Sequence, residues 1–135
     1  MTRRLRREHR HLEIRLDRLG EALSAEDARA AREAFAEAWP LAREHYAGEE
    51  SPFFAALRLH LPALAAKMLG QHEESREIAA HLEDPDLPGA EWLRLARRWL
   101  AITQHNVIEE ERDVFPLAER LLPPCDMLDD FGGSS

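Results

Sequence analysis

The sequence contains a single cysteine, Cys125, among its 135 residues. An intramolecular disulfide and a zinc site built from several thiolates are therefore both excluded. Apolar runs are also short, and none approaches the roughly 20 apolar residues that a membrane-spanning helix needs. The N-terminus is charged and lacks the apolar stretch of a secretory signal. These absences lead us to expect a cytoplasmic protein without a membrane partner.

Glycine is scarce as well, with 6 residues, and β-branched residues are few beside abundant alanine, leucine, glutamate and arginine. This composition favours helix throughout the chain. The 26 acidic and 18 basic side chains give a formal charge of −8. A surface this acidic repels phosphate backbones, so nucleic acid is not an expected partner. The basic cluster at residues 3–7 is short, and we interpret it as a solvated helix face.

Four segments carry apolar residues at spacings of three and four, which is typical of amphipathic helices. Short loops separate them, and Ser24 is expected to cap the second helix. Pro40 and Pro52 should kink or interrupt that helix. The predicted helices cover about residues 2–23, 25–60, 62–82 and 90–122.

Four such helices joined by short loops predict an all-α fold, an antiparallel up-down four-helix bundle. We place the bundle at residues 1–123 and expect residues 124–135 to form a disordered tail.

Each predicted helix also places one histidine on its apolar face: His9, His45, His72 and His105. The spacing is similar in both halves, because 63 residues separate the first and third histidines and 60 separate the second and fourth. The second and fourth helices share a further pattern of histidine, glutamates and then phenylalanine. The two halves are therefore predicted to be helix hairpins related by a pseudo-two-fold axis.

A single histidine on an apolar face is usually an ordinary core residue, but four that converge with carboxylates suggest a metal site. Burying such groups without partners costs several kcal/mol per charged group. Cations remove that cost, and nitrogen and oxygen donors without thiolate suit iron, zinc or manganese. Glu49 is the first candidate carboxylate, because it follows His45 by four residues on the same helix face.

Two carboxylates remain as candidates in the fourth helix. Glu109 follows His105 by four residues and fits an undistorted helix. Glu110 precedes Phe115 by five residues, as Glu49 precedes Phe54, so the repeat favours Glu110. A local π-bulge would let Glu110 point the same way as His105.

The remaining histidines are expected on the surface. His11 faces away from His9, His60 lies at a helix end, and His81 lies nine residues beyond His72, on the opposite helix face. Tyr46 is expected to be a core aromatic residue.

The motifs His9, His45-x-x-x-Glu49, His72 and His105-x-x-x-x-Glu110, followed by Phe115-Pro116-Leu117, resemble the hemerythrin (HHE) cation-binding family over about residues 7–122. The resemblance implies two non-haem iron ions bridged by Glu49 and Glu110. His9 and His45 would bind one iron, and His72 and His105 the other. It also implies binding or sensing of a small ligand such as dioxygen, nitric oxide or peroxide, or of iron itself, and a signalling partner.

The chain departs from hemerythrins proper at Arg76, where they have a second third-helix histidine, and at Glu110, where they have aspartate. The site should therefore be more open and more symmetric. We expect Arg76 to pair with a bridging carboxylate or a bound anion, or to extend to solvent.

Other functions compete with a carrier or sensor. A di-iron oxidase or peroxidase would use the same ligands, and the sequence does not choose between these outcomes. The ferritin-like class needs Glu-x-x-His on two helices. Only Glu8-x-x-His11 fits that pattern, which disfavours the class. A metal-free helical interaction module is the remaining alternative.

Overall fold

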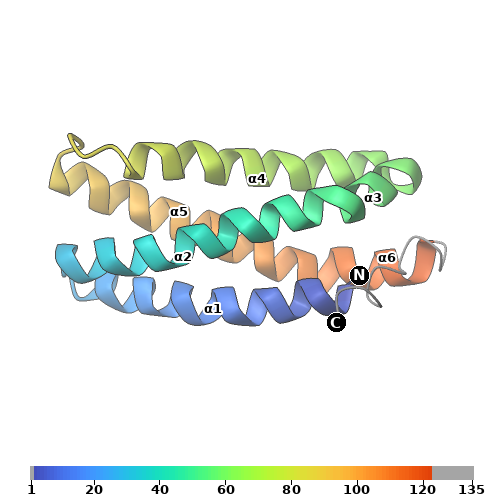
Figure 1. Ribbon diagram of the computed structural model, residues 1–135, viewed down its shortest axis with the longest axis horizontal. Helices are drawn as coiled ribbons and strands as arrows, with labels where there is room; N and C mark the ends of the chain where they lie inside the picture. Colours follow the sequence, from blue (N-terminus) through green and yellow to red (C-terminus); the bar gives the residue numbers. More distant parts are fainter. Residues whose placement is uncertain (1, 123–135) are drawn as a thin grey trace.

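The computed structural model describes residues 2–122 (Figure 1). Within that range the chain forms helices and no strand, so the predicted all-α fold is confirmed. The predicted tail at residues 124–135, with Cys125, lies outside the described residues. The elements are α1 (Thr2–Ser24), α2 (Ala28–Gly48), η1 (Glu49–Phe53), α3 (Phe54–His60), α4 (Pro62–Leu82), α5 (Gly89–Glu109), η2 (Glu110–Val114) and α6 (Phe115–Leu121), where η marks a π-helical turn.

These elements make four rods, because η1 joins α2 to α3 and η2 joins α5 to α6 without a loop. Neighbouring rods run in opposite directions (Figure 1). The contacts between neighbouring rods show the opposite directions, because higher residue numbers in one rod contact lower residue numbers in the other. Hydrogen bonds pair Thr2 with Glu119, His9 with Glu110, Arg97 with Leu23, Gln71 with Glu109, and Trp92 with Leu82.

The turn between α1 and α2 is closed by backbone hydrogen bonds. The N–H of Asp27 donates to the carbonyl of Ala22 at 3.0 Å, and the N–H of Glu26 donates to that of Leu23 at 3.1 Å. This is a Schellman motif, whose left-handed position usually holds glycine; here Glu26 occupies it with φ of 54°. Asp27 then caps α2 through its carboxylate, so the prediction that Ser24 caps this helix was wrong.

The two prolines of the second rod have different effects. α2 continues through Pro40, whereas Pro52 lies in η1, where the regular helix is interrupted. Ser51 precedes that proline and is extended, with φ of −146° and ψ of 111°. A proline ring clashes with a helical residue before it, which accounts for the extended backbone.

Both π-helical turns begin at a glutamate and end before a phenylalanine. The N–H of Phe54 donates to the carbonyl of Glu49, and the N–H of Phe115 donates to that of Glu110. These bonds span five residues instead of four. A wider turn rotates less per residue, so consecutive side chains diverge less than on an α-helix. Each turn can therefore direct two successive glutamates toward the same part of the core.

A layer of polar side chains crosses the bundle between two apolar clusters. One cluster contains Leu12 and Trp99, and the other contains Leu5 and Phe115. On α1, His9 lies between the leucines of the two clusters. The clusters hold the rods in position and keep water away from the polar layer.

The inner face of α5 differs from the predicted one. Trp99 is buried as expected, but the inward positions that follow are Thr103 and Asn106, and His105 is exposed. The predicted face advanced from Trp99 through Ile102 to His105 in two successive steps of three. Each such step falls about 60° short of a full turn, so two of them leave the inner face by about 120°. The prediction of an inward His105 was wrong for this reason.

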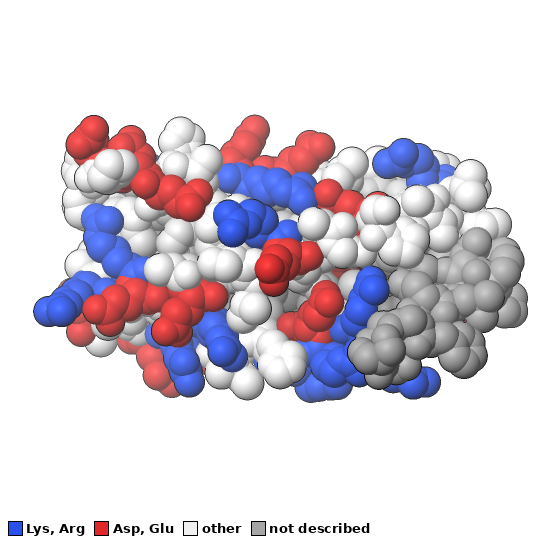
Figure 2. All heavy atoms as spheres, in the orientation of Figure 1, with Lys and Arg blue, Asp and Glu red and all other residues white. Residues whose placement is uncertain are grey.

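The exterior carries charges of both signs. On the face shown in Figure 2, acidic and basic side chains are interleaved over the helices. The side chains of His11, His60 and His81 are exposed, as predicted. None of the helices formed by residues 2–122 has the length and apolar content to cross a bilayer.

Candidate metal centre

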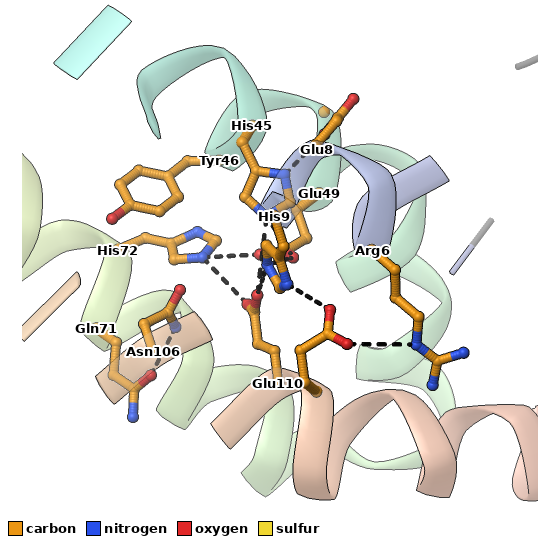
Figure 3. Close-up of polar contacts among 12 residues, drawn as sticks. Arg6, Glu8, His9, His45, Tyr46, Glu49, Gln71, His72, Asn106 and Glu110 are labelled. Atoms are coloured by element: carbon orange, nitrogen blue, oxygen red, sulfur yellow. Dashed lines mark hydrogen bonds and ion pairs between the residues drawn. The ribbon is translucent and has the colours of Figure 1, made fainter. Parts of the chain in front are cut away.

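Five buried polar side chains meet in the central layer. His9 comes from α1, His45 from α2, Glu49 from η1, His72 from α4 and Glu110 from η2. Each is at most 3% exposed. Figure 3 shows the imidazole rings arranged around the two carboxylates. All four rods of the bundle therefore contribute to one site.

The two carboxylates separate this site into two sides. On the His9–His45 side, His45 Nε2 lies 3.0 Å from Glu49 Oε2 and His9 Nε2 lies 2.8 Å from Glu110 Oε1. These four side chains present ligand atoms within 4.8 Å of one another. On the His72 side, His72 Nε2 lies 2.8 Å from Glu49 Oε1 and 3.5 Å from Glu110 Oε2. Each carboxylate thus turns one oxygen to each side, as a bridging ligand would.

Every buried histidine also contacts a second carboxylate through its outer nitrogen. Carboxylates accept hydrogen bonds and cannot donate them when ionised, so Nδ1 carries a hydrogen. In the neutral ring, Nε2 then keeps its lone pair and directs it inward. Histidines that bind metals are held in this way. The Nδ1 contacts are His9 with Glu111 at 2.7 Å, His45 with Glu8 at 2.7 Å, and His72 with Glu50 at 2.8 Å.

Arginines pair with two of the three outer carboxylates, Glu50 and Glu111. Arg76 Nη1 lies 2.8 Å from Glu50 Oε2, and Arg6 Nε lies 3.7 Å from Glu111 Oε1. Hydrogen bonds to Arg76 and His72 outweigh burial and lower the pKa of Glu50. Arg76 therefore pairs with an outer carboxylate, not with a bridging one, and keeps that carboxylate ionised.

Aromatic rings fix the planes of two of the histidines. Tyr46 stacks on His72 with ring centroids 4.0 Å apart, and Phe54 stacks on the same imidazole at 5.0 Å. Phe115 stacks on His9 at 5.3 Å. Tyr46 is buried, as expected of a core aromatic residue.

Burial and mutual contacts shift the pKa values of the paired carboxylates and of the imidazoles around them. Burial and the adjacent charge of Glu110 raise the pKa of Glu49. For Glu110, hydrogen bonds from His45, His72 and His9 outweigh burial and hold the pKa well below its usual range. Burial lowers the pKa of His72, but hydrogen bonds to Glu110 and Glu49 outweigh it and raise this pKa to about 9. The imidazoles thus supply the positive charge that Glu110 requires.

Several inward atoms nevertheless lie close to one another without forming a well-aligned hydrogen bond. They are both carboxylate oxygens of Glu49, Oε2 of Glu110, and Nε2 of His45 and His72. A buried polar atom without a partner costs about 1–3 kcal/mol. Coordination of a cation would satisfy these atoms together. The donors are imidazole nitrogen and carboxylate oxygen without thiolate, a set that suits iron, zinc or manganese.

The structure brings together most of the ligands predicted from the sequence, but not His105 or Glu109. The side chain of His105 is 66% exposed and lies 3.4 Å from Glu109 Oε1. Glu109 contacts Lys67 and accepts a hydrogen bond from Gln71 at 2.7 Å. Glu110 occupies the centre, as the repeat suggested.

Residue-by-residue reasoning missed the outer carboxylates and one inward amide. Glu8, Glu50 and Glu111 each stand directly beside a ligand in the sequence, and that adjacency is the signal that could have revealed them. Asn106 is 1% exposed and lies four residues before Glu110, as His45 lies four before Glu49. That spacing was visible in the sequence as well.

The chain was compared with protein families, curated proteins and solved structures. Neither a curated protein nor a solved structure matches it. The family model described as the hemerythrin HHE cation-binding domain matches residues 1–118. That span includes the first three rods, the fourth rod as far as the first part of α6, and every residue of the central layer. The chain belongs to the hemerythrin HHE cation-binding domain family.

Proposed function

We propose that the chain is a non-haem di-iron protein that binds or senses a small ligand such as dioxygen, nitric oxide or peroxide, or iron itself. One observation carries the proposal. Every buried imidazole has Nδ1 fixed by an outer carboxylate and Nε2 directed at the same pair of buried carboxylates. A structural polar cluster has no need of this orientation, whereas a metal ligand requires it.

The charges favour two divalent cations. Glu49 and Glu110 contribute two negative charges with essentially no exposure. The outer carboxylates of Glu50 and Glu111 pair with Arg76 and Arg6, so those arginines do not balance the charge of the central pair. Two cations would balance these carboxylates and would compete with protons for Nε2 of each imidazole.

The choice of iron and of a small ligand rests on family membership and on the donor set. Three imidazoles shared between two cations leave coordination positions open. Bound iron would supply ligand binding and one-electron redox chemistry at those positions. The chain's own residues hold and orient the ligands, and the flanking apolar clusters exclude bulk water.

A small pocket beside His45 gives a small ligand a point of approach. It has a volume of about 140 Å³ and is lined by His45 itself. Glu8, which fixes the His45 ring, is also part of its wall. The other lining residues are His11, Leu41 and Glu44.

Metal analysis and absorption spectroscopy test this function. Protein purified under aerobic and anaerobic conditions should carry about two irons per chain, and its visible absorption should change when reductant and then air are added. His45→Ala should lose metal, whereas the exposed His105→Ala should retain it. Protein without metal would support a helical interaction module and overturn the proposal. A spectrum unchanged by air would remove dioxygen as the ligand but leave metal binding intact.

A further inference from the structure

The two halves of the bundle build the site with matching contacts. Glu50 contacts His72 Nδ1 and Glu111 contacts His9 Nδ1, at 2.8 and 2.7 Å. In the sequence, Glu111 follows Glu50 by 61 residues, and His72 follows His9 by 63. Phenylalanines that close the two π-helical turns stack on the same two imidazoles. The pseudo-two-fold axis therefore relates side-chain contacts as well as helices.

Asn106 stands where this symmetry calls for a counterpart of His45. It follows His45 by 61 residues, the same interval that separates Glu49 from Glu110. Asn106 Nδ2 donates to Gln71 Oε1 at 2.6 Å, and the matching His45 Nδ1 lies 2.7 Å from Glu8 Oε1. The inward atoms also match, because Asn106 Oδ1 and His45 Nε2 are both buried and neither forms a well-aligned hydrogen bond.

A chain of hydrogen bonds fixes which way the Asn106 amide points. Glu109 pairs with Lys67 and accepts a hydrogen bond from Gln71 Nε2 at 2.7 Å. An ionised carboxylate only accepts, so Gln71 must direct its NH2 group to Glu109 and its Oε1 to Asn106. Asn106 must then direct its NH2 group to Gln71. Its Oδ1 is left facing the interior, on the side of His72 (Figure 3).

We propose that Asn106 Oδ1 is a cation ligand on the His72 side, and that the two cation positions are therefore unequal. This inference rests on the proposed di-metal function. The His9–His45 position offers two imidazoles and two carboxylate oxygens. The His72–Asn106 position offers one imidazole, one carboxamide oxygen and the other two carboxylate oxygens.

The unequal donors predict unequal metal chemistry. Imidazole suits iron and zinc, whereas carbonyl and carboxylate oxygens suit harder cations such as manganese. The His9–His45 position should fill first with iron. The His72–Asn106 position should bind iron more weakly and tolerate manganese better. A mixed iron–manganese centre is then a stable product when both metals are supplied.

Anaerobic titration with Fe²⁺, followed by calorimetry and counting of bound metal, tests the assignment. The wild-type chain should bind two ions, the second at least tenfold more weakly than the first. Asn106→Leu removes the oxygen at similar volume and should reduce binding to one ion without changing the first affinity. The double variant Gln71→Glu/Asn106→His rebuilds the His45–Glu8 arrangement and should tighten the second site at least tenfold. If Asn106→Leu does not fold, the affinity of the double variant for the second ion still tests whether residue 106 is a ligand.

Manganese provides an independent readout. After one equivalent of Fe²⁺, added Mn²⁺ should give a protein-bound electron paramagnetic resonance signal in the wild type but not in Asn106→Leu. The exposed His105→Leu on the same helix is the control and should behave as wild type.

Two equal affinities in the wild type, a single site in the wild type, or a second site unaffected by either Asn106 change would each overturn the inference. Absence of any bound iron in the wild type would instead overturn the proposed function itself.

Discussion

Replacing Glu111 with glutamine should weaken the first cation position while leaving the fold intact. Glu111 lies outside the ligand set, but its Oε2 lies 2.7 Å from His9 Nδ1. Glutamine keeps the size of the side chain and removes its charge. The neutral amide makes His9 less basic, and its N–H groups can stabilise the tautomer that carries hydrogen on Nε2. Loss of such outer partners typically reduces metal affinity about 10–100-fold.

The expected magnitude follows from linkage. A tenfold loss of affinity is about 1.4 kcal/mol, and at a fixed excess of metal the stabilisation of the folded chain falls by the same amount. For a domain of this size, 1.4 kcal/mol corresponds to a decrease in Tm of roughly 4–7 °C. Thermal denaturation with saturating Fe²⁺ should show this decrease under anaerobic conditions. With a chelator present, the difference between Glu111→Gln and the wild type should be smaller.

Glu119→Gln is the matched control for this prediction. Both glutamates interact with Arg6, but Glu119 bonds to Arg6 and Thr2 and belongs to no histidine contact described here. Its substitution should leave metal affinity within about twofold, because a partly exposed ion pair contributes little. Equal losses in both variants, or unchanged affinity in Glu111→Gln, would refute the role assigned to the outer carboxylates.

His72→Ala and Glu49→Ala should each lose most of the bound metal and lower the Tm. Elemental analysis measures the metal content, and thermal denaturation measures the Tm. Retention of both irons would contradict the ligand assignment. Glu26→Gly should raise the free energy of unfolding by about 0.5–1 kcal/mol in urea, because the φ of 54° is accessible to glycine without strain; Glu26→Ala should give no such gain. Acidification from pH 7 to 5 should release cations, because protons compete with them for the imidazole lone pairs. The metal content of the protein after desalting at each pH checks this prediction. An unchanged metal content would argue against ligation by imidazole.

The sequence predicted the helices well because their signals are local. Apolar spacing located the rods, and Pro52 correctly marked a break in the second one. The inner face of α5 was harder to predict, because a periodicity error accumulates along a helix. The apolar Ile102 lies three residues after Trp99 and fitted the predicted inner face. His105 lies three residues further on and therefore looked like a ligand. Asn106, on the true inner face, is a residue type that carries little metal-binding signal when considered alone.

The choice between Glu109 and Glu110 shows what an internal repeat can add. Helical spacing from His105 favoured Glu109, but that reasoning began from a residue that points outward. The interval to Phe115 favoured Glu110, and the structure places Glu110 among the histidines. This interval is informative because it spans the π-helical turn, which both halves share. The same repeat pairs His45 with Asn106, because each lies four residues before the bridging glutamate of its rod.

The π-helical turns hold two of the three outer carboxylates, Glu50 and Glu111, each directly after a bridging carboxylate. On a regular helix Glu49 and Glu50 would diverge by about 100°, and in a π-helical turn they diverge less. In η1 the wider turn lets Glu49 reach the centre while Glu50 contacts His72 Nδ1. In η2, Glu110 likewise reaches the centre while Glu111 contacts His9 Nδ1. Each of these two local departures from α-helical geometry thus supplies a bridging carboxylate and the residue that orients a histidine on another rod.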